Sequence, residues 1–78
     1  MQYFQPQENA LVAHFTFADF VEAMAFINKV AVLAEEQQHH PTISNTYNRV
    51  SLLLTTHDAG NTITNKDEQL AQAIEQLL

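Results

Sequence analysis

Cysteine is absent from this chain of 78 residues, and basic side chains are scarce. Without cysteine the chain has no disulfides and no thiolate zinc site, which fits a reducing compartment. Three Lys and Arg residues stand against nine Asp and Glu residues, so the formal net charge is −6. An acidic surface of this kind repels phosphate backbones, and we therefore expect no direct binding of nucleic acid.

Long apolar stretches are also missing. No run approaches the roughly 20 apolar residues that a membrane-spanning helix needs. The amino terminus lacks the basic region and apolar core that are typical of a signal peptide. The sequence therefore predicts a cytoplasmic protein without a membrane association.

The length predicts a single domain over residues 1–78, and a domain this small buries little apolar surface alone. Hydrophobic residues nevertheless make up 46% of the chain. Small domains without disulfides often gain stability by oligomerisation. We therefore expect a homodimer or a homotetramer.

Two periodicities divide the chain into elements. Alternation of apolar and polar residues predicts strands over 10–17 and 50–56, with weaker strands at 3–4 and 43–47. Helical spacing predicts one helix that ends near 37 and a second helix that begins near 65. The resulting order β-β-α-β-β-α predicts an α+β fold, a four-stranded antiparallel sheet with two helices on one face.

Local signals mark the ends of these helices. Thr16, with Asp19 three residues on, predicts the first helix start, and Thr64 with Asp67 predicts the second. Pro41 ends the first helix, because the residue before a proline avoids helical geometry. Asn48-Arg49 is a turn candidate between the third and fourth strands.

The first helix is apolar on most of its surface. One stripe at helical spacing comprises Phe20, Met24, Ile27, Ala31 and Ala34, and further apolar residues lie outside it. A helix that is apolar on several sides is covered on more than one side. Since little chain remains to cover it, this pattern also predicts a partner subunit.

Three of the four histidines fall within two dozen residues. His39 and His40 are adjacent and precede Pro41, and His57 follows the clearest strand. Imidazole can give and take protons near neutral pH, so converging histidines are suited to acid-base catalysis.

Spacing alone leaves other interpretations of these histidines open. His39 and His40 can be exposed residues at a helix end, where the helix dipole favours positive charge. One of them can also join His57 and Asp58 in a metal site, since histidine and carboxylate bind zinc.

A wider pattern favours catalysis. The sequence Glu35-x-x-x-His39-His40-Pro41 is followed by Tyr47-Asn48-x-Val50, by Thr55-Thr56-His57-Asp58 and by Asp67. Together with Phe15-x-Phe17-x-Asp19-Phe20 upstream, this arrangement resembles the signature of the pterin-4a-carbinolamine dehydratase family over roughly residues 11–78.

The resemblance implies an enzyme that dehydrates 4a-hydroxytetrahydrobiopterin to quinonoid dihydropterin and water, and so recycles tetrahydrobiopterin. The pterin is the substrate, and the family uses no metal and no cofactor of its own. The implied fold is the one predicted above, often preceded by an extra amino-terminal helix that we expect this chain to lack. The implied assembly is a dimer or a tetramer.

The resemblance also implies roles for individual residues. His39 and His57 would be the general acid and base, and His40 would contact the pterin as the third histidine of the catalytic set. Glu35 and Asp67 would hold imidazoles in place without touching the pterin. The implied pocket lining is Pro41, Thr56, Asp58 and Ala59.

The chain departs from the family pattern at three places. Glu36 stands where the family usually has lysine, Ile43 stands where an aromatic residue is common, and the loop between His57 and Asp67 is one residue longer. Two alternative functions stay open: a non-catalytic module that binds a partner protein, and a protein that acts on another pterin.

Overall fold

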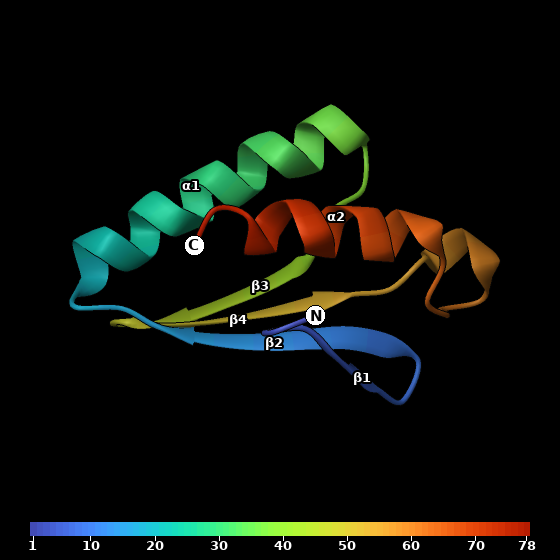
Figure 1. Ribbon diagram of the computed structural model, residues 1–78, viewed down its shortest axis with the longest axis horizontal. Helices are drawn as coiled ribbons and strands as arrows, with labels where there is room; N and C mark the ends of the chain where they lie inside the picture. Colours follow the sequence, from blue (N-terminus) through green and yellow to red (C-terminus); the bar gives the residue numbers. More distant parts are fainter.

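The computed structural model describes all residues of the chain, 1–78. The elements in chain order are β1 (Gln5–Gln7), β2 (Ala10–Thr16), α1 (Phe20–Gln37), β3 (Thr42–Thr46), β4 (Arg49–Leu54), the short 3₁₀ turn η1 (His57–Ala59) and α2 (Asn65–Glu75). All neighbouring strands are antiparallel, in the order β1-β2-β4-β3. Both helices lie on one face of this sheet (Figure 1), which confirms the predicted α+β fold.

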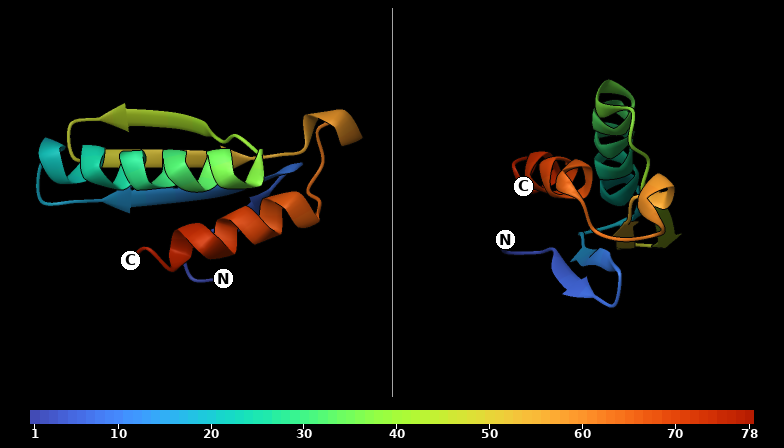
Figure 2. Two further views of the ribbon diagram at one scale, coloured as in Figure 1. Left: turned by 90° about the horizontal axis from the view of Figure 1, so that it is seen from above. Right: turned by 90° about the vertical axis from the view of Figure 1, so that its right-hand side faces the viewer.

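Alternation along β2 and β4 separates the two faces of the sheet. Leu11, Ala13 and Phe15 of β2 are buried on the helix side, and they meet buried residues of β4 across the pair. The two helices lie side by side over these strands, α1 above β4 and α2 toward β1 (Figure 2). Neither helix has both the length and the hydropathy that a membrane crossing would require.

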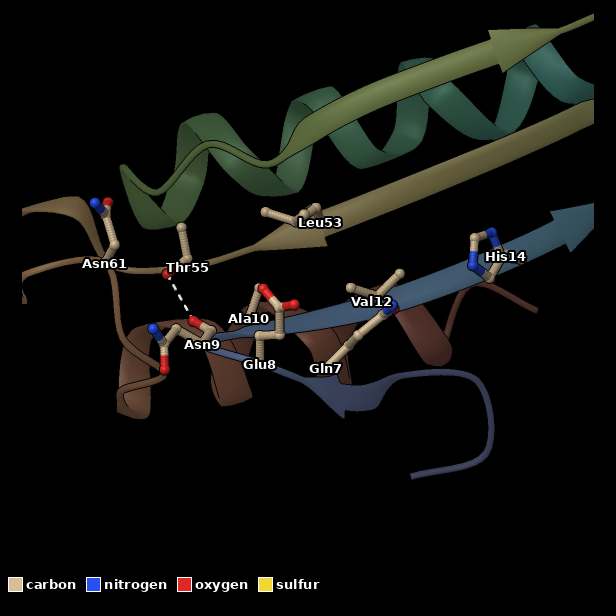
Figure 3. A pocket seen from close by; sticks show the side chains of 9 residues that line it. All are labelled: Gln7, Glu8, Asn9, Ala10, Val12, His14, Leu53, Thr55 and Asn61. Carbon is tan, nitrogen blue, oxygen red and sulfur yellow. Dashed lines mark hydrogen bonds between the residues drawn. The ribbon is translucent and has the colours of Figure 1, made fainter.

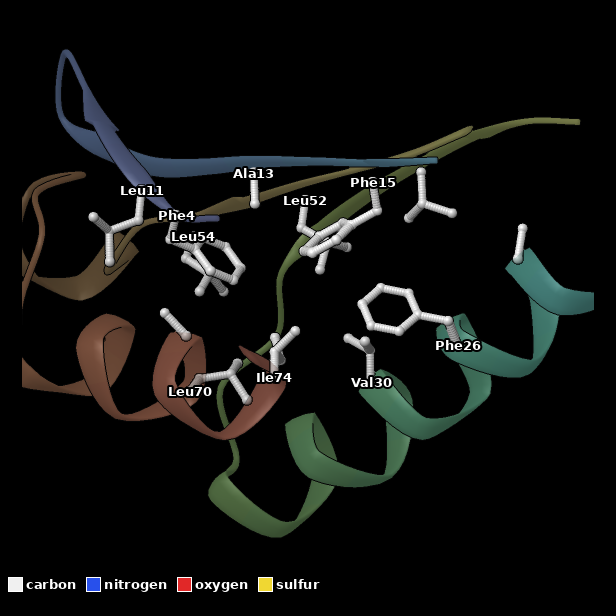
Figure 4. Close-up of a cluster of buried hydrophobic side chains, with 13 residues drawn as sticks. Phe4, Leu11, Ala13, Phe15, Phe26, Val30, Leu52, Leu54, Leu70 and Ile74 are labelled. Carbon is white, nitrogen blue, oxygen red and sulfur yellow. The ribbon is translucent and has the colours of Figure 1, made fainter. Parts of the chain in front are cut away.

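The core fills the space between the sheet and the helices (Figure 4). It comprises Phe4, Leu11, Ala13, Phe15, Ala23, Phe26, Val30, Val50, Leu52, Leu54, Leu70, Ala71 and Ile74. Phe15 lies at its centre, with its ring centroid 4.8 Å from Phe26 and 6.3 Å from Phe4. Aromatic packing therefore joins the sheet both to α1 and to the amino-terminal segment.

The start of α1 differs from the prediction. Its N-cap is Asp19, whose carboxylate accepts a hydrogen bond from the Glu22 N–H at 2.8 Å. Thr16 is instead the last residue of β2 and pairs with Arg49. The predicted cap at Thr16 was wrong because the chain stays outside the helix beyond it: the Phe17 N–H donates to the Asn48 carbonyl at 2.8 Å, and α1 begins only at Phe20. The predicted end near residue 37 and the Thr64–Asp67 capping box of α2 are confirmed.

The buried face of α1 also differs from the predicted stripe. Ala23, Phe26, Val30 and Ala34 face the core, whereas Phe20 is 48% exposed. A helix with apolar residues on most sides has no pattern that selects the core face, so tertiary packing decides it. Val21 and Val32 remain 75% and 58% exposed. The expected partner subunit stays a prediction.

Strand ends shift by one or two residues from their predicted positions. β3 runs from Thr42 to Thr46, and the turn lies at Tyr47-Asn48 instead of Asn48-Arg49. Tyr47 has a φ of 52°, and the Asn45 side chain donates hydrogen bonds to the Tyr47 and Arg49 carbonyls. At the amino terminus, β1 begins at Gln5 instead of at Tyr3.

Glu75, at the end of α2, holds the amino-terminal segment in place. Its carboxylate accepts backbone hydrogen bonds from Gln2, Tyr3 and Phe4 at 3.0, 2.7 and 2.8 Å. Burial alone would raise the pKa of Glu75, but these three hydrogen bonds outweigh it and lower the pKa. Because Phe4 is buried, the contact also keeps an aromatic side chain in the core.

We predict that Glu75→Gln lowers the free energy of unfolding at pH 7 by about 1–3 kcal/mol, because neutral amide oxygen is a weaker acceptor than carboxylate. The Glu75 contribution is present above the carboxyl pKa of the unfolded chain, about 4.3, and is lost as pH falls through the lower folded pKa. Urea unfolding of both proteins at pH 7 and at pH 3 measures this. The exposed substitution Glu36→Gln is the control, and an equal effect of both substitutions would contradict the prediction.

Candidate functional site

His39 lies where the chain leaves α1. Gln38 adopts the left-handed conformation with a φ of 51°, and the His39 N–H donates to the Ala34 carbonyl at 3.1 Å. This helix end turns the His39 side chain toward α2, where its Nε2 lies 2.6 Å from Asp67 Oδ1. The His39 side chain is 11% exposed and that of Asp67 is fully buried.

Asp67 is a buried carboxylate with a complete set of donors. Beside His39 on Oδ1, its Oδ2 accepts the Thr56 hydroxyl at 2.7 Å and the Thr64 N–H at 2.9 Å. The Thr56 and Thr64 hydroxyl oxygens are 2.6 Å apart. Since Thr56 donates to Asp67, Thr64 donates to Thr56. This network ties the segment that follows β4 to the start of α2.

The environment of Asp67 sets the state of His39. Burial raises the pKa of Asp67, while the hydrogen bonds from His39, Thr56 and Thr64 lower it, and the net result is a lowered pKa. The ionised carboxylate can only accept hydrogen bonds, so His39 Nε2 carries the hydrogen. His39 Nδ1 is therefore the nitrogen that is left to exchange a proton with a bound molecule.

His57 opens the turn η1, and Thr55 and Thr56 separate it from the end of β4. Its Nδ1 lies 2.9 Å from Asn61 Oδ1, and Asn61 has a φ of 58°. An amide oxygen accepts, so in this arrangement Nδ1 carries the hydrogen and Nε2 is free. His57 is exposed, in contrast to His39.

His40 has an exposed carboxylate as its partner, unlike His39 and His57. Its Nε2 lies 2.6 Å from Glu35 Oε2, but the two side chains are 59% and 71% exposed. Exposed pairs of this kind contribute only about 0–1 kcal/mol to stability. Glu35 therefore orients His40 without fixing it as firmly as Asp67 fixes His39.

The three imidazoles line one polar pocket of about 220 Å³. Its lining residues are Gln38, His39, His40, Thr55, Thr56, His57, Asp58 and Lys66. Residues at the end of α1 and in the segment after β4 thus meet at one pocket. No three His, Asp or Glu side chains lie close enough together to hold a metal ion, so the alternative metal site has no donor set here.

Two of the residues expected to line this pocket lie outside it. Pro41 is half-buried and is not among the lining residues. Ala59 lines an adjoining hollow of about 370 Å³ together with Thr56 and Asp58. Ala59 is the last residue of η1, and the start of α2 supplies Asn65 and Lys66 to the same hollow.

Sequence reasoning missed several residues of the site. Lys66 and Gln38 line the pocket, and Asn61 holds His57. Asn61 follows Gly60 in the loop, and Asn tolerates positive φ. The sequence therefore indicated a turn at this position, but it did not indicate the hydrogen bond to His57. Lys66 directly precedes Asp67, and no motif in the sequence indicated that it would line the pocket.

A larger hollow, of about 470 Å³, lies along the sheet face that bears no helix (Figure 3). Gln7, Ala10, Val12, His14 and Leu53 are among the residues that line it, and it shares Thr55 with the histidine pocket. His14 is the only histidine that lines this hollow. The three clustered histidines therefore line the smaller of these two pockets.

Several known proteins are similar to this chain over most of its length. A Thermomicrobium roseum protein with the provisional name pterin-4-alpha-carbinolamine dehydratase is 56% identical over 71 residues, which cover 91% of this chain and 75% of that protein. A Synechococcus protein with the same provisional name is 48% identical over 77 residues, which cover 99% of this chain and 82% of its own length.

Solved structures share the fold. The crystal structure of a transcriptional coactivator/pterin dehydratase from Brucella melitensis matches with a TM-score of 0.86 and 35% identity, over 94% of this chain and 79% of that one. A pterin dehydratase-like protein, identified as a RuBisCO assembly factor in the alpha-carboxysome, matches with a TM-score of 0.76 and 23% identity, over 95% of this chain and 84% of that one. At that identity the second likeness shows the fold alone.

The model of one protein family spans nearly the whole sequence. It matches residues 2–77 and carries the description Pterin 4 alpha carbinolamine dehydratase. The chain therefore belongs to the pterin 4 alpha carbinolamine dehydratase family.

Proposed function

We propose that this protein dehydrates 4a-hydroxytetrahydrobiopterin to quinonoid dihydropterin and water. The observation that carries the proposal is the convergence of His39, His40 and His57 on one pocket, each with a different partner on one ring nitrogen. The partners leave His39 Nδ1 and His57 Nε2 free, on side chains from separate segments.

The reaction needs little beyond proton placement. The bond from C4a to the hydroxyl oxygen breaks, and the oxygen leaves as water after it receives a proton. The lone pair of the neighbouring ring nitrogen forms the new C=N bond, and that nitrogen gives its proton to a base. One proton is supplied and one is removed, so the net products are the quinonoid pterin and water.

We assign the proton donor to His39 and the proton acceptor to His57. The buried Asp67 carboxylate compensates the positive charge of a protonated His39. His57 has only a neutral amide as partner, so its Nε2 presents a lone pair. His40 contacts the pterin at the rim, oriented by Glu35. The chemistry calls for no metal and no cofactor.

A second candidate is a non-catalytic module that binds a partner protein. The exposed apolar side chains Phe20, Val21 and Val32 of α1 favour it, because apolar patches on small domains mark interaction sites. The same side chains suit the homodimer or homotetramer that the sequence predicts. Activity against the carbinolamine separates the two candidate functions.

We predict that His39→Ala and His57→Ala each slow the dehydration about 10²–10⁴-fold, the usual contribution of a positioned acid or base. Stopped-flow absorbance of freshly generated 4a-carbinolamine measures the rate, and EDTA dialysis should leave it unchanged. Because His57 is exposed, added imidazole should partly restore His57→Ala. An unchanged rate in both variants, with folding intact, would refute the proposal, and Glu36→Gln is the matched control.

Asp67→Asn should impair both folding and catalysis, because an amide replaces a buried carboxylate that accepts three hydrogen bonds. We expect a loss on the order of 3 kcal/mol in the free energy of unfolding. Since the pKa of Asp67 is lowered on folding, its stabilising effect is present above about pH 4 and fades as pH falls through the folded value. Urea unfolding from pH 7 to pH 3 tests this, and a difference that persists undiminished at pH 3 would contradict it.

Asn61→Gly removes the partner of His57 while keeping the positive φ at this position, which glycine accepts readily. We expect His57 to populate both tautomers and kcat to fall on the order of tenfold, equivalent to one lost hydrogen bond. The ring ¹⁵N shifts of His57 report the tautomer directly. Asn61→Asp keeps an acceptor and should retain the wild-type tautomer; identical His57 spectra in all three proteins would show that Asn61 does not position the ring.

A further inference from the structure

One face of the sheet carries no helix (Figures 1 and 2). Polar side chains of β2, β4 and β3 lie next to one another across this face. The antiparallel register places His14 opposite Ser51, and Ser51 opposite Ser44. Two residues further along the same strands, and so on the same face, Arg49 lies opposite Thr46. Directly opposed side chains have Cβ atoms about 4.5–5.5 Å apart, so these groups are immediate neighbours.

These five residues line a hollow of about 330 Å³ with no apolar residue in it. Three hydroxyls, one guanidinium and one imidazole therefore meet there, and His14 Nδ1 lies 2.9 Å from Ser51 Oγ. Each hydroxyl can donate one hydrogen bond, and the Arg49 guanidinium offers a planar fork of donors. This donor set suits the oxygens of a phosphate group.

Charge sets this face apart from the rest of the molecule. None of the nine acidic residues lines the five-residue hollow, and Glu8 is the one acidic residue that lines the larger hollow beside it. The two ion pairs of the molecule join His39 to Asp67 and His40 to Glu35, so Arg49 has no carboxylate partner. A guanidinium without an anion, among hydroxyls, is available to an external anion.

Two apolar side chains, Val12 and Leu53, lie beside this cluster. The hollow of about 470 Å³ in Figure 3 shares His14 with it, and Val12 and Leu53 form a cross-strand pair there. Leu53 is 37% exposed although it is a large aliphatic side chain. A molecule with its phosphate at Arg49 would thus find apolar surface for its organic body on the far side of His14.

We propose that the helix-free face binds a small phosphomonoester, with its phosphate at Arg49, His14 and the three hydroxyls and its organic body over Val12 and Leu53. The formal charge of −6 disfavours a long polyanion, so the ligand is a single phosphate group on a small molecule. This site is separate from the histidine pocket, and it does not depend on the proposed dehydratase activity.

The test is a titration of ¹⁵N-labelled protein in phosphate-free buffer with inorganic phosphate, adenosine monophosphate and adenosine. We expect saturable amide shifts at Ser44, Arg49 and Ser51 with the monophosphate, weaker binding of inorganic phosphate, and no binding of adenosine. Equal affinity for phosphate and the monophosphate would overturn the placement of the organic body. Shifts centred on His39, His57 and Lys66 would overturn the site itself.

Matched variants separate a specific site from general attraction. Arg49→Ala should weaken binding of the monophosphate about tenfold or more, the value of one or two charge-assisted hydrogen bonds. Lys29→Ala removes the same charge from α1 and should leave the affinity unchanged. An equal loss in both variants would refute the proposal. If Arg49→Ala fails to fold, Arg49→Gln gives the same comparison.

Discussion

The hydrogen-bonded carboxylate of Asp67 is the contact on which the rest of the site depends. It is fully buried, and it joins the segment after β4 through Thr56, the start of α2 through Thr64 and the end of α1 through His39. An unpaired buried charge is costly, so these three segments are stable only in one relative arrangement. The same carboxylate caps α2 and orients an imidazole, which couples the stability of the fold to the geometry of the pocket.

The pocket is therefore built from residues at the ends of helices and strands, and not from the middle of any element. His39 follows the left-handed residue that closes α1, His57 opens the turn after β4, and Lys66 lies in the first turn of α2. Such positions leave side chains free of sheet and helix packing while the core below holds their backbones. The small core, centred on Phe15, thereby acts as a rigid base for the side chains that line the pocket.

The sequence predicted much of this arrangement, and its failures have physical causes. Alternation identified β2 and β4 because one face of each is buried. The resemblance to the dehydratase signature, and not spacing alone, indicated that His39, His40 and His57 act together. The core face of α1 could not be predicted, since apolar residues on most sides remove the periodic signal. Thr16 resembled a helix cap, but pairing with Arg49 keeps it in the strand. The Glu75 clamp joins residues more than 70 positions apart and has no local pattern.

Binding of a pterin is the most direct test of the account. A crystal structure of the protein with dihydrobiopterin should show the bicyclic ring in the histidine pocket, within hydrogen-bonding distance of His39 Nδ1 and His57 Nε2. A ring bound elsewhere, or imidazoles that point to separate patches of solvent around an empty pocket, would contradict the central claim that these side chains form one catalytic site.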